Sequence, residues 1–196
     1  MSFSGDVKKE IAEHKISKPC CIVAACYAIA CFGKYFDDKG VILHTEKAFV
    51  AKFAKSMYER IGISGKIFVK GTENMPIYEF AIKQAEDVTR LLQTFGHTGK
   101  ETALHINEDI FKCDNCYSSF FAAAFLCTGI VTNPKSDYNL EFTCNRQGRI
   151  FDLQKLLQKC EFNFKHIVRN STQVLYIKSS TQIEDLLTTI GAPNAS

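Results

Sequence analysis

Nine cysteines are the residues of this 196-residue sequence that offer the most evident chemistry. Cys113 and Cys116 form a Cys-x-x-Cys pair, a spacing with which one chain segment can supply two thiolates to a zinc ion. Cys20 and Cys21 precede an apolar segment much as Cys116 does, so four thiols could meet at one place. However, the spacing is irregular, and the helix starts that carry the thiols could splay apart. Small buried thiols are the commoner outcome, so we predict no metal site and no cofactor.

Histidine and glycine patterns give no second candidate site. The four histidines outside the N-terminal segment lie in unrelated contexts, and we expect each to be exposed or hydrogen-bonded within the fold: His44, His97, His105 and His166. We find no Ser/His/Asp arrangement for nucleophilic catalysis and no glycine-rich phosphate-binding loop. The sequence therefore predicts no catalytic residue set of these kinds.

The elements that would position any site occur twice. Residues 180–191 (STQIEDLLTTIG) align without gaps on residues 85–96 (AEDVTRLLQTFG), an offset of 95. An apolar segment that ends at Gly33 has a counterpart that ends at Gly129, an offset of 96. Offsets this similar indicate two copies of one unit of roughly 95 residues, which is too long a period for a solenoid. We predict one body with a pseudo-two-fold axis, and function where the two copies meet.

Composition indicates an ordinary globular protein. Hydrophobic residues make up 46% of the chain and charged residues 23%, with a net charge of +3, which does not by itself imply nucleic acid. The charged N-terminus has no apolar core, which argues against a signal peptide. The longest apolar runs, residues 20–33 and 116–131, are too short for a membrane span. We therefore expect a cytoplasmic protein with reduced thiols.

Each copy predicts the element order α-β-β-α-β-β-α. We expect an arm at residues 1–18, then a single domain at 19–196 with repeat one at 19–96, a connection at 97–114 and repeat two at 115–191. The fold class is α+β, with two four-stranded sheets flanking two central helices. An amphipathic helix is expected at 150–160, and Thr181 with Glu184 is expected to form a capping box at the last helix.

The two central helices are expected to pack directly on each other. Both are apolar nearly all round, as buried helices are, and both are rich in small residues that let two backbones approach closely. The expected interface residues fall at equivalent places in the two copies: Ala25, Ala28 and Gly33 in the first, and Ala122, Ala124 and Gly129 in the second.

Residues 25–33 (ACYAIACFG) and 121–129 (FAAAFLCTG) resemble the paired motif of the LAGLIDADG homing endonucleases. The resemblance implies that, in active members of that family, the residue before the final glycine is an acid that holds a divalent metal ion. Here these two positions are Phe32 and Thr128, which supply no charge. The nearest acids, Asp37 and Asp38, have no counterpart in the second copy. We therefore predict no catalytic residue and no metal at this place.

The whole chain is more closely similar to the bacterial WhiA family. The similarity rests on the opening MSFSGDVKKEIAEHK, on Cys20-Cys21, on residues 120–134 (FFAAAFLCTGIVTNP) and on residues 190–194 (IGAPN). It implies a regulator of transcription, cell division and sporulation that acts at the bacterial nucleoid. It also implies that this chain is a degenerate, non-cleaving LAGLIDADG module. Members of that family continue into a C-terminal helix-turn-helix, and this sequence ends before it.

The resemblance also implies sheet faces that contact DNA phosphates. Six basic residues of the predicted strand pairs are candidates: Lys66, Lys70, Lys83, Lys165, Arg169 and Lys178. Three glutamates near the basic residues of the first copy reduce its positive charge: Glu73, Glu79 and Glu86. A solvated sheet face is therefore as good an interpretation as a face that contacts DNA. The expected partners are DNA, bound weakly, or a regulatory protein, with a monomeric chain. A pure protein-interaction module is the alternative, and an active endonuclease is a further one that the missing acids disfavour.

Overall fold

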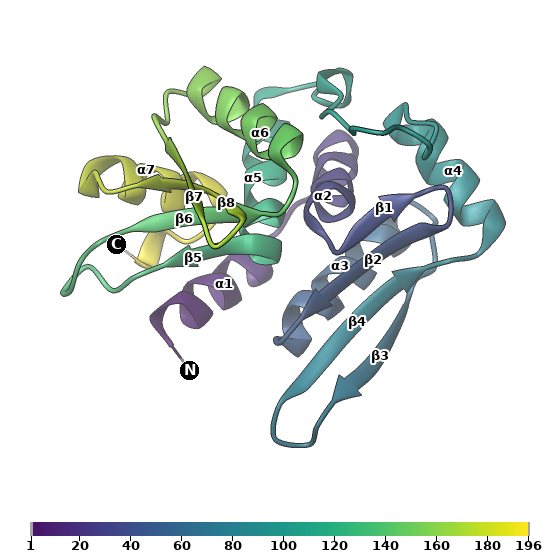
Figure 1. The fold of residues 1–196 in the computed structure, drawn as a ribbon, viewed down its shortest axis with the longest axis horizontal. Coiled ribbons are helices and arrows are strands. Elements are labelled where there is room, and N and C mark those ends of the chain that lie inside the picture. The colour runs from purple at the N-terminus through teal and green to yellow at the C-terminus, as the bar shows by residue number, and fades with distance from the viewer. Residues whose placement is uncertain (1, 196) are drawn as a thin grey trace.

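The structure, a computed structural model, describes residues 2–195 (Figure 1). The first repeat contains seven elements: α2 (Pro19–Phe32), β1 (Tyr35–Asp37), β2 (Gly40–Thr45), α3 (Ala48–Arg60), β3 (Lys66–Gly71), β4 (Pro76–Ile82) and α4 (Ala85–Phe95). The second repeat contains the same seven in the same order: α5 (Asp114–Thr128), β5 (Gly129–Val131), β6 (Leu140–Cys144), α6 (Gln147–Lys159), β7 (Lys165–Arg169), β8 (Thr172–Ile177) and α7 (Ser180–Ile190). Helix α1 (Phe3–Glu13) precedes both, η1 (Glu108–Ile110) lies in the connection and η2 (Pro193–Ala195) follows α7.

Both sheets are antiparallel and share one topology. The strand order is β1-β2-β4-β3 in the first sheet and β5-β6-β8-β7 in the second. Figure 1 shows the two sheets on opposite sides of the central helices α2 and α5, with the β3–β4 hairpin reaching away from the body. The predicted α+β fold of two αββαββα repeats with two four-stranded sheets is confirmed.

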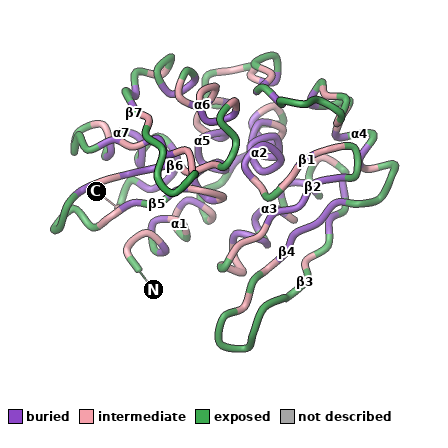
Figure 2. Tube along the Cα trace, viewed as in Figure 1, coloured by how far each residue is buried: buried purple, intermediate pink, exposed green. Residues whose placement is uncertain are grey.

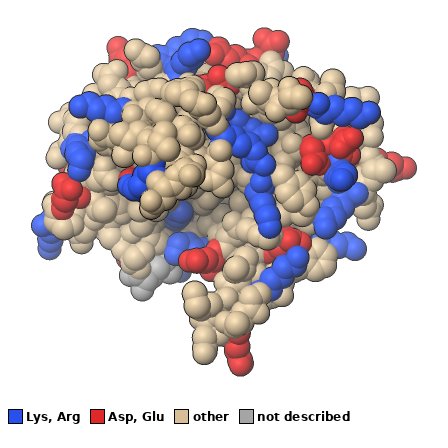
Figure 3. All heavy atoms as spheres, viewed as in Figure 1, with Lys and Arg blue, Asp and Glu red and all other residues tan. Residues whose placement is uncertain are grey.

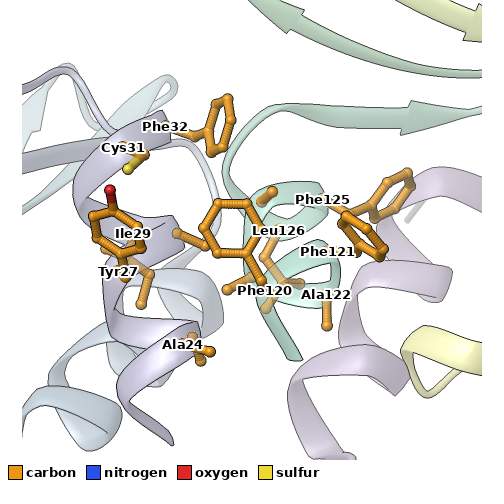
Figure 4. Packing of buried hydrophobic residues seen from close by; sticks show 14 of the residues in the cluster. Ala24, Tyr27, Ile29, Cys31, Phe32, Phe120, Phe121, Ala122, Phe125 and Leu126 are labelled. Carbon is orange, nitrogen blue, oxygen red and sulfur yellow. The ribbon is translucent and has the colours of Figure 1, made fainter. Parts of the chain in front are cut away.

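Helices α2 and α5 form the centre of the core. Almost every residue of α2 from Cys21 onward is buried, as the absence of a polar face predicts (Figure 2). The ring of Phe120 from α5 lies against α2, with its centroid 5.9 Å from that of Tyr27 and 6.0 Å from that of Phe32 (Figure 4). The two helices are therefore in direct contact, and a large aromatic side chain fills the space that the small residues leave.

Glycine ends these helices because larger residues do not fit. A Cβ atom at Gly129 would lie 2.1 Å from the ring of Phe125, and one at Gly33 would lie 2.8 Å from the carbonyl oxygens of Ile29 and Ile42. At the ends of α4 and α7, Gly96 and Gly191 adopt φ angles of 71° and 107°, the left-handed region that favours glycine.

The N-terminal segment forms a helix that belongs to the same core. Ser2 accepts a hydrogen bond from the Gly5 amide at 3.1 Å and so caps α1, which buries Val7 and Ile11. On the adjacent turn, Lys8 places its ammonium 5.8 Å from the centroid of the Phe125 ring of α5. Helix α1 thus covers the C-terminal part of α5.

Two local predictions were wrong. The cap of α7 is Ser179, whose hydroxyl accepts from the Gln182 amide at 3.3 Å, so the expected Thr181 lies inside the helix. Helix α6 begins at Gln147, three residues before the expected start, because the polar first turn carries no apolar periodicity. In the part of the chain that the structure describes, no helix is long and apolar enough to cross a membrane.

Candidate nucleic-acid interface

The two residues expected at the acid positions of the LAGLIDADG motif, Phe32 and Thr128, lie at the C-terminal ends of α2 and α5 and carry no carboxylate. Phe32 is buried, and its ring meets that of Phe120 edge-on at 74°. Thr128 is half-buried and donates its hydroxyl hydrogen bond back to the Ala124 carbonyl at 3.2 Å. The carboxylate of Asp37 accepts a hydrogen bond from the Lys39 amide at 2.8 Å and so stabilises the turn that contains both residues.

A buried cation occupies the same end of α2. Arg149, from the first turn of α6, is 5% exposed, and its guanidinium donates to the Cys31 carbonyl at 3.0 Å. Next to it, Arg146 donates to the Lys34 carbonyl at 3.0 Å. A positive charge at a helix C-terminus is stabilised by the helix dipole, but it repels a divalent ion. Hard divalent ions favour carboxylate oxygens, and Phe32, Thr128 and Arg149 supply none, so the site does not fit the metals of the endonucleases.

The sheet faces that point away from the helices are the other candidate surface. In the first sheet, Phe80 stacks on Tyr58 of α3, and its register partner on β3 is Ile67. Because side chains alternate along a strand, Lys66 and Lys70 point to the opposite face. We call this the first open face, and Figure 1 looks onto it with α3 behind.

The second sheet repeats this arrangement. His166 of β7 packs on Phe151 of α6, with ring centroids 4.6 Å apart, and its register partner is Leu175 of the core. The neighbours Lys165 and Arg169 therefore point away from the helices and form the second open face. Lys66 and Lys165 both begin an edge strand, β3 and β7, so they occupy equivalent places in the two repeats.

Buried glutamates neutralise part of this positive charge. Glu79 of β4 is 4% exposed and accepts from Lys70 at 3.0 Å and from His44 at 2.7 Å. The hydrogen bond from His44, followed by that from Lys70, lowers the pKa of Glu79 against the opposing effect of burial. Arg169 is the counterpart of Lys70 on the second sheet. It pairs with the buried Glu141 at 2.6 Å, and this hydrogen bond raises the pKa of Arg169.

The six candidate basic residues thus divide into two groups. Lys70 and Arg169 are held by glutamates on the open faces, and Lys178 pairs with Asp137 at 3.1 Å. Lys66, Lys83 and Lys165 are exposed and have no ion-pair partner among residues 2–195. Figure 3 shows Lys and Arg interleaved with Asp and Glu on this side of the molecule, so its charge is mixed.

The open faces also carry exposed apolar side chains. Phe68 and Ile77 of the first sheet are 46% and 38% exposed, and Ile130 and Ile167 of the second are 47% and 41% exposed. Each lies on the same face as the lysines, by the strand register. The surface is therefore amphipathic and could meet a phosphate backbone or an apolar partner.

The helix-pair residues expected from the sequence all lie inside or at the edge of the core. Ala25, Ala28, Ala122, Ala124 and Gly129 are buried and Gly33 is half-buried. Whether each contributes to the helix contact stays a prediction. Sequence reasoning missed Arg149 and Glu141 as structural charges. A single charged residue between apolar neighbours, as in Leu140-Glu141-Phe142 and next to Ile150, was the available signal.

The four cysteines considered at the outset lie together. Their sulfur atoms come from the starts of α2 and α5 and all fall within 4.8 Å of one another. The expectation that these helix starts splay apart is not met. The remaining cysteines of the described chain, including Cys26 and Cys31 of the buried α2, lie outside this group.

Known proteins resemble this chain over nearly all of its length. Residues 117–196 match the family described as the WhiA LAGLIDADG-like domain. A probable cell division protein WhiA of Clostridium botulinum is 32% identical over 98% of this chain, and one of Carboxydothermus hydrogenoformans is 30% identical over 98%. The chain spans 65% and 64% of the length of these two relatives.

Solved structures share the fold. Full-length WhiA from Thermatoga maritima matches 98% of this chain and 62% of its own, with a TM-score of 0.75 and 18% identity. The homing endonuclease I-DmoI in complex with DNA and Mn matches 87% of this chain and 97% of its own, with a TM-score of 0.58 and 11% identity. At these identities the structures show the fold alone. Sequence relatives, family match and fold agree: this chain is similar to WhiA proteins along nearly all of its length, its residues 117–196 match the WhiA LAGLIDADG-like domain, and its fold is that of the LAGLIDADG structures.

Proposed function

We propose that this chain is the N-terminal module of a WhiA-type DNA-binding transcription regulator, involved in cell division and sporulation. In this proposal residues 19–96 and 115–191 are the two repeats, joined by residues 97–114. The module acts as a monomer at the bacterial nucleoid, where it contacts DNA weakly and does not cleave it. The names of the relatives, which are cell division proteins, support the process.

The absence of catalysis is supported by the helix ends. The two positions that would hold a metal-binding acid are Phe32 and Thr128, and the buried guanidinium of Arg149 lies close by. A site that binds divalent metal for phosphodiester cleavage needs carboxylates where this chain has an aromatic ring, a hydroxyl and a cation.

The observation that carries the proposed DNA contact is the pair Lys66 and Lys165. Each is exposed, has no ion-pair partner in the described chain and begins the edge strand of its sheet on the open face. Two lysines at equivalent positions suit two phosphates of a duplex with its own pseudo-two-fold symmetry. With so few free cations, we expect non-specific binding with dissociation constants of about 10⁻⁴–10⁻⁶ M at physiological salt.

The test is charge reversal on the open faces against charge reversal behind the sheets. Lys66→Glu with Lys165→Glu should reduce duplex binding by roughly tenfold or more at low salt, measured by fluorescence anisotropy. Lys52→Glu with Lys155→Glu, on the exposed sides of α3 and α6, is the matched control and should lose little. An equal loss in both double variants would mean that only net charge attracts the DNA.

A protein-interaction module is the second candidate function. It is supported by the exposed Phe68, Ile77, Ile130 and Ile167 on the same faces. If the unaltered chain does not bind duplex DNA even at low salt, this second candidate replaces the first. A Phe68→Ser/Ile167→Ser double variant, which removes apolar area and no charge, should leave DNA binding unchanged under the first proposal.

A further inference from the structure

The thiols of Cys20, Cys21, Cys113 and Cys116 have the geometry of a tetrathiolate centre. The sulfur of Cys113 lies 3.7 Å from each of the other three, and all four lie within 4.8 Å of one another. Around a tetrahedral zinc ion with Zn–S bonds of about 2.3 Å, neighbouring sulfurs are about 3.8 Å apart. The three sulfur–sulfur distances to Cys113 thus equal those around a single zinc ion. A small inward movement of the other three sulfurs would bring all four to zinc-binding distance.

The backbone holds the thiols in this arrangement. Cys20 and Cys21 are the second and third residues of α2, Cys113 is the N-cap of α5, and Cys116 is the third residue of α5. Both helices start at the same end of the core, and Phe120 packs against Tyr27 in the turns that follow. Two helix starts on a packed pair therefore fix the four Cα–Cβ directions before any ion arrives.

The electrostatic surroundings favour negative sulfur. A zinc ion with four thiolates carries a net charge of about −2, and the N-terminal ends of two helices each present a partial positive charge to it. Lys18, the residue before Pro19 at the start of α2, and Lys112, directly before Cys113, are exposed and add further positive charge.

Burial indicates a structural site with an entry path. Cys21 and Cys116 are 3% and 0% exposed, whereas Cys20 and Cys113 are half-buried and reach the surface. Structural zinc sites are closed, with four protein ligands and no open position for substrate. An ion here would join residues 92 and 93 positions apart and so fasten the first repeat to the second.

We propose that Cys20, Cys21, Cys113 and Cys116 bind one zinc ion that fastens the starts of α2 and α5 to each other. The occupant is a single ion because the sulfurs are too close together to surround several metals. A disulfide would use only two of the four thiols. It would not explain why three sulfurs lie at the same distance from the sulfur of Cys113. The site is independent of the open faces and of the proposed DNA contact.

The first experiment measures metal in the full chain, purified under reducing conditions without chelator. Mass spectrometry of the metal content should give about one zinc per chain, and a chromogenic chelator should release it after thiol modification. Cobalt added to the stripped protein should give the thiolate-to-metal charge-transfer and intense visible bands of a tetrahedral thiolate site. Absence of both zinc and the cobalt bands would overturn the proposal, as would stoichiometric iron in place of zinc.

Matched variants locate the ion. Cys113→Ser and Cys116→Ser should each lose stoichiometric zinc and the cobalt bands. Cys160→Ser changes a half-buried cysteine that directly follows α6 and lies outside the cluster, and it should retain both. If Cys116→Ser does not fold, Cys113→Ser on the accessible side and the cobalt spectrum of the unaltered chain still decide. Retention of zinc in both ligand variants would overturn the site.

Discussion

The hydroxyl of Tyr27, in the middle of α2, lies 2.7 Å from Nε2 of His97, the first residue after α4 and its terminal glycine. The same hydroxyl accepts a hydrogen bond from the Asn107 amide at 2.6 Å. On the other side of the imidazole, His97 Nδ1 lies 2.6 Å from a carboxylate oxygen of Glu101. One buried hydroxyl thus joins the first residue of the connection between the two repeats to a residue in its middle.

Removal of that hydroxyl should destabilise the fold without a change in shape. Tyr27→Phe leaves the Asn107 amide and the His97 ring without their partner, which should lower the free energy of unfolding by about 1–3 kcal/mol. Denaturant titration with circular dichroism measures this. Tyr117→Phe is the control, because the Tyr117 hydroxyl has no hydrogen bond to the described residues and its ring stacking on Phe111 is retained. Equal stability of the two variants would contradict the proposed importance of the connection.

Acid should weaken the connection through Glu101. Burial opposes ionisation of Glu101, but hydrogen bonds from Thr98, His97 and backbone amides outweigh it and lower the pKa to about 2. The folded chain therefore binds this proton less readily than the unfolded chain. The stabilisation is complete above the ordinary pKa of 4.5 and is lost as the pH falls toward 2.

We expect Glu101→Gln to lower the free energy of unfolding at pH 7 by about 1 kcal/mol, after allowance for solvent screening. The difference from the unaltered chain should shrink as the pH falls from about 4.5 to 2. Glu73→Gln, at the exposed turn of the β3–β4 hairpin, is the control and should show no such window. A pH-independent difference for Glu101→Gln would show that its charge is not the cause.

Alkaline conditions should favour the fold through Lys8. Burial, the largest cause, lowers the pKa of Lys8 from 10.5 to about 8, and the nearby Cys127 partly offsets this effect. Between pH 8 and 10.5 the unfolded chain binds a proton that the folded chain has lost, so stability rises with pH in this window.

Lys8→Met should therefore raise the free energy of unfolding at pH 7, by about 1–2 kcal/mol once the lost contact with the Phe125 ring is deducted. The advantage should diminish as the pH approaches 10.5. Lys9→Met alters the exposed neighbour and should have little effect. Thermal unfolding at several pH values measures both, and a Lys8→Met variant less stable than the unaltered chain at pH 7 would contradict the argument.

Overpacking should destabilise the central helix pair. Ala28 and Ala124 are 0% exposed, so a leucine at either position has no free volume to enter. Each substitution should cost about 1–3 kcal/mol, seen as a lower denaturation midpoint. Ala85→Leu, at the exposed start of α4, is the control and should be nearly neutral. An unchanged midpoint for both core variants would count against close packing of α2 and α5.

The sequence by itself determined the repeat, the central helices and the topology class. These follow from local patterns: an offset near 95 between equivalent segments, the absence of a polar face in residues 20–32, and glycine where a helix must end. It also supplied the prediction that Phe32 and Thr128 stand where the endonuclease motif has acids, because residue types are known without coordinates.

Only the tertiary structure decided how the charges and thiols pair. The sequence marked Lys70 and Arg169 only as candidate phosphate contacts, and strand register places each beside a buried glutamate. The meeting of Cys20 and Cys21 with Cys113 depends on the relative position of two helices more than 90 residues apart. Periodicity reports which face of an element is buried, whereas contacts between elements depend on register and packing across the whole core, which no single segment encodes.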